Sequence, residues 1–176
     1  GQSIFNDADV RRAPNYVGQA WRARILPVRA IKEGEDLSRD FRIDALGYAI
    51  DMGAQIVNMS WSEVCGPDDT TVPVPLRCTQ DEGDAKTATL ADEFQQAGAD
   101  QALIVVGGID LGVNLDKDGV TDLPTELGLP NQISVTAVTD TDTFPTDGKI
   151  SYGSAYDIAA PGVHMVGLSS EGIVLP

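Results

Sequence analysis

The chain has 176 residues, of which 42% are hydrophobic, and a formal net charge of −15 from 12 Lys and Arg against 27 Asp and Glu. The length suits one domain with a real core, and no apolar run approaches the roughly 18 residues of a membrane span. The charge makes nucleic acid and anionic membranes poor partners. It suits a secreted, salt-tolerant or calcium-binding protein, but simple solubility explains it equally well, and we favour that explanation.

The N-terminal part offers few strong patterns. The sequence begins with Gly1, and no charged-then-apolar signal segment precedes it, so we expect a processed form or a piece of a longer protein. Residues 1–18 are polar and are expected to form a loop or a frayed helix. The apolar stretch 24–30 predicts a strand in which Pro27 takes an unpaired position.

Apolar spacing then predicts a helix followed by a strand. Asp36 or Ser38 is expected to cap the helix, and Gly53 to end it. A buried strand is predicted over residues 55–61. The apolar residues that recur at three- and four-residue spacing in the helix are Phe41, Ala45, Leu46, Ala49 and Ile50.

Residues 62–84 are predicted to form a long loop, which in a compact domain is usually functional or an insertion. The loop is rich in Gly, Pro and Asp and holds the only two cysteines, Cys65 and Cys78. Their spacing suits a disulfide, although two free thiols are the alternative. We favour the disulfide, which implies secretion or another oxidising compartment.

The second half continues the alternation of helix and strand. Thr87 is predicted to cap a helix that Gly98 closes, and strands are predicted over 102–108 and 132–138, with an acidic loop over 111–131 between them. Short strands are expected at 150–152 and 163–166. The order strand, helix, strand, helix, strand predicts a single domain with a parallel sheet and right-handed crossovers.

The segment Val106-Gly-Gly-Ile-Asp110 is the first candidate for a site. It directly follows the apolar run of a buried strand, and ligands of open α/β sheets bind at the carboxyl ends of strands. Gly107 and Gly108 have no β-carbon, so we expect other backbone to come close to them. The alternative is a tight turn with no ligand.

Four ordered motifs resemble a known family. Ala23-Arg-Ile-Leu-Pro-Val-Arg29, Ala49-Ile-Asp-Met-Gly-Ala-Gln-Ile-Val-Asn-Met-Ser60, Ile133-Ser-Val-Thr-Ala-Val138 and Asp157-Ile-Ala-Ala-Pro-Gly-Val163 are similar to the middle of a subtilisin-like serine peptidase, or subtilase. The resemblance covers about residues 17–168. It implies an α/β fold of the subtilisin type, a three-layer α/β/α sandwich with a mainly parallel sheet.

The resemblance also shows which catalytic groups are missing. A subtilase uses an Asp in a strand-end motif, a His in a His-Gly-Thr helix and a Ser in a Gly-Thr-Ser helix. None of these motifs occurs within residues 1–176, and the only histidine, His164, stands where the family has an ordinary strand residue. We therefore expect one subtilase-like domain without the segments that carry the triad.

Asp110 is a second departure from the family, which has an Asn there whose amide helps to bind the oxyanion. A carboxylate at this place accepts hydrogen bonds and repels a developing negative charge. Losing one such donor typically costs about 10²–10³ in rate. A protonated Asp could donate instead, and some relatives carry Asp here, so the change argues against efficient catalysis at neutral pH without excluding it.

The resemblance implies that a peptide-binding edge is partly kept. The segment matching Ser60-Trp61-Ser62 pairs with substrate backbone in the family, where it runs Ser-Leu-Gly. Val106, Gly107 and Gly108 match the facing wall of the first specificity pocket. Trp61 fits this edge and fits a core aromatic equally well.

The acidic loop suggests a cation site. Asn114, Asp116, Asp118 and Asp122 place oxygen ligands at alternate positions around the glycine turn at Gly119, which suits calcium. The expected acid at the twelfth position is missing, and a solvated acidic loop is the alternative.

Three hypotheses follow from these patterns. The first is a non-catalytic subtilase-like module, either a pseudoenzyme or a structural or interaction domain in a larger assembly. The second is the central piece of an active endopeptidase whose Asp, His and Ser lie on other segments or chains. The third and weakest is a calcium-stabilised module that uses the peptide groove. All three predict a peptide or protein as partner.

Overall fold

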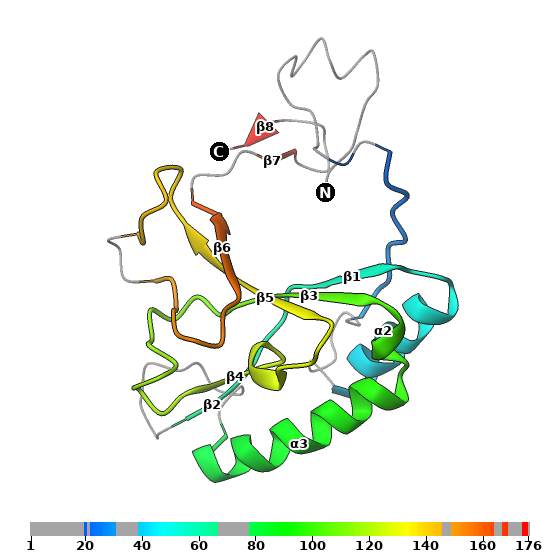
Figure 1. Ribbon diagram of the computed structural model, residues 1–176, viewed down its shortest axis with the longest axis horizontal. Helices are drawn as coiled ribbons and strands as arrows, with labels where there is room; N and C mark the ends of the chain where they lie inside the picture. Colours follow the sequence, from blue (N-terminus) through cyan, green and yellow to red (C-terminus); the bar gives the residue numbers. More distant parts are fainter. Residues whose placement is uncertain are drawn as a thin grey trace. The chain divides into compact units, whose positions relative to one another are not determined.

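The computed structural model describes residues 20, 22–30, 39–66, 78–145, 149–163, 167–168 and 174–175. The chain divides into two units, Val28–Val163 and the combined ends Gly1–Pro27 and His164–Pro176. The regular structure described in the second unit is one antiparallel pair, β7 (Gly167–Leu168) with β8 (Val174–Leu175). The fold and the site described below belong to the unit Val28–Val163 (Figure 1).

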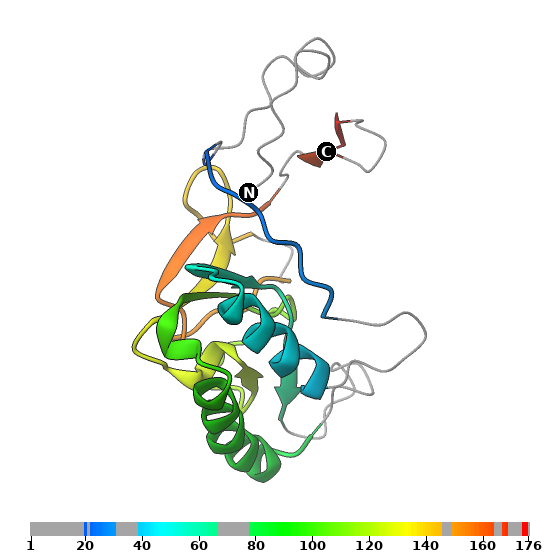
Figure 2. The same cartoon turned by 90° about the vertical axis from the view of Figure 1, so that its right-hand side faces the viewer.

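A four-stranded parallel sheet forms the centre of this unit. Its strands are β1 (Ile56–Met59), β3 (Leu103–Gly107), β5 (Gln132–Val138) and β6 (Ile158–Pro161), and they lie in that order. β6 forms the edge away from β1 (Figure 2). The prediction of an α/β fold with a mainly parallel sheet is confirmed.

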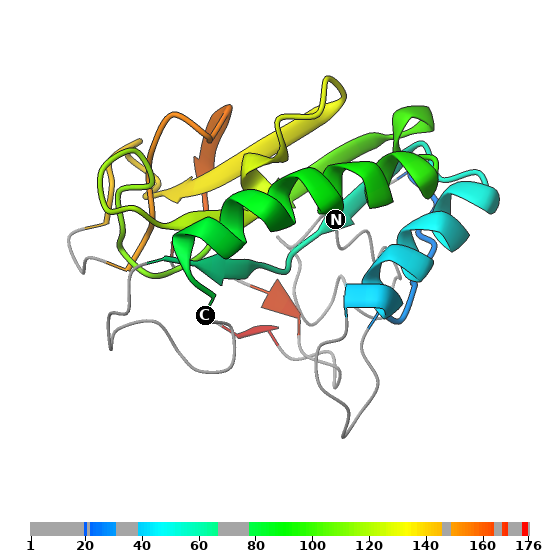
Figure 3. The same ribbon diagram turned by 90° about the horizontal axis from the view of Figure 1, so that it is seen from below.

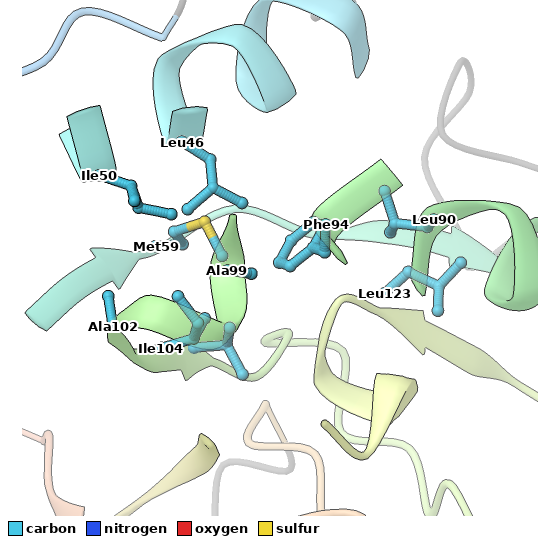
Figure 4. Close-up of a cluster of buried hydrophobic side chains, with 10 residues drawn as sticks. Leu46, Ile50, Met59, Leu90, Phe94, Ala99, Ala102, Ile104 and Leu123 are labelled. Atoms are coloured by element: carbon cyan, nitrogen blue, oxygen red, sulfur yellow. The ribbon is translucent and has the colours of Figure 1, made fainter. Parts of the chain in front are cut away.

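Two helices cover one face of the sheet, α2 (Arg39–Asp51) and α3 (Gln80–Gln96) (Figure 3). Strand side chains alternate between the two faces, so Ile104 and Val106 of β3 point toward the helices and are 0% exposed. Phe94 and Leu90 of α3 meet them in the main core (Figure 4). The core cluster comprises Leu46, Ile50, Met59, Leu90, Phe94, Ala99, Ala102, Ile104, Val106 and Leu123.

Helix α2 matches its predicted pattern only in part. Leu46, Ala49 and Ile50 are buried, but Phe41 is 45% exposed. Gly53 ends the helix with a φ of 82°, as predicted, because a residue without a β-carbon adopts this left-handed conformation without strain. The predicted caps Asp36 and Ser38 lie outside the described residues.

Helix α3 begins earlier than predicted. Thr79 and Glu82 form a capping box in which each side chain accepts a hydrogen bond from the other's backbone N–H. Thr87 therefore lies inside the helix, where its hydroxyl donates to the carbonyl of Gly83 at 2.9 Å. A β-carbon at Gly83 would lie 2.8 Å from Cβ of Cys65, so the glycine that resembled a loop residue allows close packing.

Both predicted loops contain regular structure. β2 (Glu63–Cys65) lies in the stretch 62–84 and pairs antiparallel with β4 (Thr121–Leu123), which lies in the stretch 111–131. The short 3-10 helices η1 (Ala99–Gln101) and η2 (Thr125–Leu127) follow α3 and β4 respectively. Strands of three residues are too short to show an alternating pattern, which explains why sequence reasoning missed them.

Two predicted strands differ from the structure, and a third lies mostly outside the described residues. Residues 24–30 form no strand; Ile25 is 63% exposed, and Pro27 lacks the N–H that a ladder needs. At 150–152 only a single bridge forms, between Tyr152 and Asn114. The last strand of the parallel sheet is β6 at Ile158–Pro161, which was not predicted. Of the strand predicted at 163–166, residues 164–166 lie outside the described part, as do residues 1–18.

The opposite face of the sheet is apolar and open. Within the described residues of the unit Val28–Val163, both α-helices pack on the same face. Ile56 of β1 and Ile158 of β6 are 63% and 52% exposed. Strands of parallel sheets are normally covered on both faces, so this face has the composition of a surface that another layer covers.

Candidate functional site

A cavity of about 330 Å³ lies at the carboxyl ends of the four parallel strands. This is the edge at which open α/β sheets bind ligands. Most of the lining residues are apolar or glycine, and Asn58, Ser60 and Asp110 have polar side chains. The cavity is lined by Asn58, Ser60, Val105, Val106, Gly107, Gly108, Ile109, Asp110, Val135, Thr136, Ala137, Ala160, Pro161 and Gly162.

The structure brings five of the predicted site residues to this cavity, namely Ser60, Val106, Gly107, Gly108 and Asp110. They come from two neighbouring strand ends, because β1 and β3 pair in parallel register. Ser60 is exposed, and its hydroxyl oxygen accepts a hydrogen bond from the Asn58 amide at 3.3 Å.

Trp61 and Ser62 do not line the cavity. The Trp61 ring packs against the main core, and the guanidinium carbon of Arg42 lies 4.4 Å from its centroid. This distance is within the range of a cation–π interaction. Arg42 is itself only 3% exposed, so Trp61 joins α2 to the end of β1 as a core aromatic.

Gly108 is needed for a close approach of the Tyr156 ring. A β-carbon at Gly108 would lie 2.2 Å from Cε1 and 2.4 Å from Oη of Tyr156. Gly107 differs, because a β-carbon there would meet nothing within 4 Å. The sequence predicted that other backbone would come close to these glycines; the group that comes close to Gly108 is instead a side chain, the Tyr156 ring.

The carboxylate of Asp122 fixes the backbone of the next residue, Ile109, by a hydrogen bond. The backbone N–H of Ile109 donates to Oδ2 of Asp122 at 3.0 Å, and the hydroxyl of Thr125 donates to the same oxygen at 3.0 Å. The Asp122 N–H donates to Oε2 of Glu126 at 2.7 Å. Burial raises the pKa of Asp122 and also that of Glu126.

The buried side chain of Ser151 fixes the backbone that follows Asp110. The N–H groups of Leu111 and Val113 donate to Oγ of Ser151 at 3.3 and 3.4 Å, and Ser151 is 0% exposed. Asp110 itself is exposed, and its carboxylate accepts no hydrogen bond from the residues that the structure describes. A fixed backbone therefore presents a free carboxylate beside the cavity.

The predicted calcium ligands do not converge. Both carboxylate oxygens of Asp116 accept from the Ser154 N–H, at 2.9 and 3.0 Å, and Asp118 accepts from the Asn114 N–H at 2.7 Å. Asp122 is directed to Ile109 instead. In the described ranges no three His, Cys, Asp or Glu side chains are grouped to hold a metal, so the calcium site stays a prediction without geometric support.

Cys65 and Cys78 form a disulfide, as predicted. It joins the end of β2 to the start of α3. The search for spanning helices, made over the described residues, finds none with the length and apolar character that crossing a bilayer needs. His164 lies outside the described residues.

Comparison with models of protein families matches residues 5–174 to the subtilase family, peptidase S8. The chain belongs to the subtilase family. The match spans nearly the whole chain, including every strand of the parallel sheet and the strand ends that line the cavity. No curated protein sequence matches this subtilase chain closely enough to count as a relative.

Solved structures similar to this subtilase chain are proteases that share its fold. MycP1 from Mycobacterium smegmatis has a TM-score of 0.60 at 18% identity, over 91% of this chain and 46% of that one. The nisin leader peptidase NisP from Lactococcus lactis has a TM-score of 0.56 at 12% identity, over 77% of this chain and 46% of that one. A lanthipeptide protease has a TM-score of 0.57 at 19% identity, over 77% of this chain and 37% of that one. The chain thus spans less than half the length of these structures.

Sequence reasoning missed the part of the subtilase cavity formed by β5 and β6. Thr136, Ala137, Ala160 and Pro161 line it, but none has a side chain typical of a site. Their position follows from strand order, since β5 lies between β3 and β6 and all three end at the same edge. The local sequences of β5 and β6 do not indicate a binding site, whereas the strand order β1-β3-β5-β6 shows that their ends lie at the same edge as the end of β3.

Proposed function

We propose that this subtilase domain binds an extended peptide across the ends of β1 and β3 and does not cleave it on its own. The cavity between the strand ends supports the binding role, because Ser60, Gly107 and Gly108 offer backbone and small side chains beside an apolar lining. Extended peptides bind such edges through main-chain hydrogen bonds. NisP, one of the similar structures, is a leader peptidase, which supports a peptide as the ligand class.

The lack of cleavage rests on what the chain carries in place of catalytic groups. Residues 1–176 hold neither a His-Gly-Thr nor a Gly-Thr-Ser motif. Asp110 adds a carboxylate where acyl transfer needs a hydrogen-bond donor for the developing oxyanion. The exposed Asp110 between Ile109 and Leu111, whose N–H groups are fixed by Asp122 and Ser151, is the observation that carries this proposal.

A binding experiment tests the first part. Isotope-labelled chain is titrated with a set of unlabelled hexapeptides while amide chemical shifts are followed, and the peptides are then recovered and analysed by mass spectrometry. We expect shifts at Ser60 and at Gly107, Gly108 and Asp110, with the peptides recovered intact. Shifts confined to residues remote from the strand ends, or cleaved peptides, would contradict the proposal.

A second candidate is the central part of an active endopeptidase that other segments complete. The open apolar face of the sheet favours it, because Ile56 and Ile158 are more than half exposed on strands of a type normally covered on both sides. The similar structures are more than twice as long as the part that this chain matches, so most of their residues lie outside the matched part.

Co-expression distinguishes the two candidates. The chain is produced with a second polypeptide that carries the subtilase Asp, His and Ser segments, and the mixture is treated with a fluorophosphonate probe. Labelling of the second polypeptide only when the chain is present would favour the completed enzyme. Absence of labelling in a complex that forms would favour the binding module.

The compartment and the metal belong to the proposal as well. The disulfide between Cys65 and Cys78 supports a secreted or otherwise oxidising location. A bound calcium ion would compete with Ser154 for the carboxylate oxygens of Asp116. A calcium-dependent rise in melting temperature that is lost in Asp116→Ala would support the metal site, and an unchanged melting temperature would remove it.

A further inference from the structure

The antiparallel pair of β2 and β4, which we call the β2–β4 ribbon, lies apart from the four-stranded sheet and contacts the candidate site (Figure 1). Each strand of the ribbon has three residues. A two-stranded pair of this size is at best marginally stable in water by itself. The order of the ribbon therefore depends on its attachments to the rest of the domain.

The disulfide is the covalent attachment of the ribbon. Cys65, the last residue of β2, is bonded to Cys78, which directly precedes the capped start of α3. The Gly66 N–H donates to the carbonyl of Cys78 at 2.8 Å, so the backbone follows the bridge. An ion pair between Lys86 of α3 and Glu63 of β2 adds a non-covalent link. Partly exposed ion pairs contribute little to stability, so the bridge is the stronger of the two attachments.

The other strand of the ribbon fixes part of the cavity wall. Val64 of β2 pairs with Asp122 of β4, and Oδ2 of Asp122 accepts the Ile109 N–H at 3.0 Å. Ile109 and the next residue, Asp110, both line the cavity. A continuous series of bonds thus leads from the disulfide through the ribbon to the cavity wall.

Gly108 and Ile109 are neighbours in the chain but have different anchors. The Gly108 N–H donates to the carbonyl of Val135 in β5 at 3.0 Å, which fixes Gly108 to the parallel sheet. The Ile109 N–H donates to Asp122 of the ribbon instead. A loss of order in the ribbon would therefore release Ile109 while Gly108 stays in place.

We propose that the disulfide between Cys65 and Cys78 is a redox switch for the cavity wall. In the oxidised chain the ribbon is ordered and fixes Ile109 and Asp110, and reduction of the bridge by a dithiol releases both residues. The structural effect is independent of the proposed function, whereas its consequence for affinity rests on the proposed peptide binding.

The two sulfur atoms differ in their access to a reductant. Cys65 is 0% exposed, whereas Cys78 is partly exposed. A thiolate of the dithiol attacks Sγ of Cys78, the S–S bond breaks, and Cys65 leaves as a thiolate that takes up a proton. The second thiol of the reductant then displaces Cys78, so the dithiol becomes a disulfide and both cysteines become thiols.

The amide signals of Ile109 and Gly108 test the structural effect. An isotope-labelled chain is measured by NMR before and after addition of dithiothreitol, below its melting temperature. We expect the Ile109 amide proton to shift upfield and to acquire the steeper temperature dependence of an amide bonded to water, while Gly108 keeps both properties. The double variant Cys65→Ser, Cys78→Ser should show the reduced pattern with and without dithiothreitol.

Two results of this measurement would overturn the switch. One is an Ile109 signal that reduction leaves unchanged. The other is an equal change at Gly108 and Ile109, because the bridge would then stabilise the whole domain rather than the ribbon. A chain that unfolds on reduction gives this second result.

Variants of Asp122 test whether the effect passes through its hydrogen bond. Asp122→Leu removes the acceptor and is expected to give the unbonded Ile109 signal in both redox states. Asp122→Asn keeps an acceptor oxygen and is expected to keep the response to reduction, and it serves if Asp122→Leu fails to fold. Near-ultraviolet circular dichroism verifies each fold. A full response in Asp122→Leu, or none in Asp122→Asn, would contradict the proposed path.

Peptide affinity separates this inference from the proposed function. Because a released wall must be ordered again on binding, we expect reduction to weaken binding of the hexapeptides roughly tenfold. Equal affinity of the oxidised and reduced chains would contradict the switch and leave peptide binding in place. If no hexapeptide binds in either state, the proposed function fails, and the Ile109 signal still decides whether the switch exists.

Discussion

Gly108 and Tyr156 approach each other so closely that the chain tolerates no side chain at position 108. A β-carbon there would lie 2.2 Å from Cε1 of the ring, well inside van der Waals contact. The contact joins the end of β3 to the segment that leads into β6, and Gly108 itself lines the cavity. Packing inside the domain and the shape of the candidate site thus depend on the same glycine.

Gly108→Ala is therefore expected to destabilise the domain by about 1–3 kcal/mol, the usual cost of overpacking a well-filled interior. The matched control is Gly107→Ala, because a β-carbon at Gly107 meets nothing within 4 Å. Urea unfolding followed by circular dichroism measures both. Equal midpoints for the two variants would show that the Tyr156 contact is not tight.

Thr79→Ala is expected to lower the free energy of unfolding by about 1 kcal/mol, since it removes the capping box at the start of α3. Thr89→Ala serves as the control; Thr89 is exposed within the same helix, where alanine has the higher helix propensity. The melting temperature of Thr79→Ala should therefore fall below that of Thr89→Ala. A loss at position 89 as large as that at position 79 would argue against the observed helix start.

The stability of the domain should depend on pH through Asp122. Burial raises the pKa of Asp122 in the folded state above its usual value of 3.8, so the folded state holds this proton more tightly than the unfolded state does. The contribution of Asp122 to stability therefore falls as the pH rises from 3.8 through the raised pKa. Asp122→Asn should remove this fall, as measured by urea unfolding at a series of pH values.

Asp116 provides a control of opposite sign. Hydrogen bonds from Ser154 lower the pKa of Asp116 below its usual 3.8. The contribution of Asp116 to stability is present above pH 3.8 and is lost as the pH falls through the lowered pKa. Asp116→Asn should therefore flatten the acid side of the same profile and leave the decline caused by Asp122 in place. Identical profiles for the two variants would contradict the assignment.

Removal of the disulfide by the double change Cys65→Ser and Cys78→Ser should lower the free energy of unfolding by about 3 kcal/mol, since the closed loop is of moderate length. Denaturant unfolding of the oxidised chain and of the double variant measures the difference. Intact mass before and after alkylation establishes that the parent chain is oxidised. A difference near zero would indicate that the bridge does not constrain the unfolded state.

Three of the parallel strands, β1, β3 and β5, could be predicted from their local sequences, whereas β6 at Ile158–Pro161 was missed because a strand was expected at 163–166 instead. The run that ends at Val106 is a continuous apolar stretch, and the run 132–138 alternates polar residues with apolar, mostly β-branched ones; both form strands in the structure. The start of α3 could not be found in this way. Gly83 resembles a loop residue, and its role as the point of contact with Cys65 exists only after the chain has folded.

The candidate site was predictable only where one local segment forms it. Gly107, Gly108 and Asp110 follow one strand, and the rule for strand ends identified them. Asp122 was assigned to a metal because oxygen ligands alternate along its loop, but β4 pairs with β2 and leaves its carboxylate buried against Ile109. That role depends on a strand pairing over long range, which a local pattern does not contain.

The central claim is that this subtilase domain binds at its strand ends without the groups that cleave. Its most direct test is intact-mass spectrometry of the purified, homogeneous chain after incubation with a fluorophosphonate probe, together with Asp110→Asn. We predict an unchanged mass for both proteins. A mass increase that maps to one serine of the unmodified chain would contradict the claim.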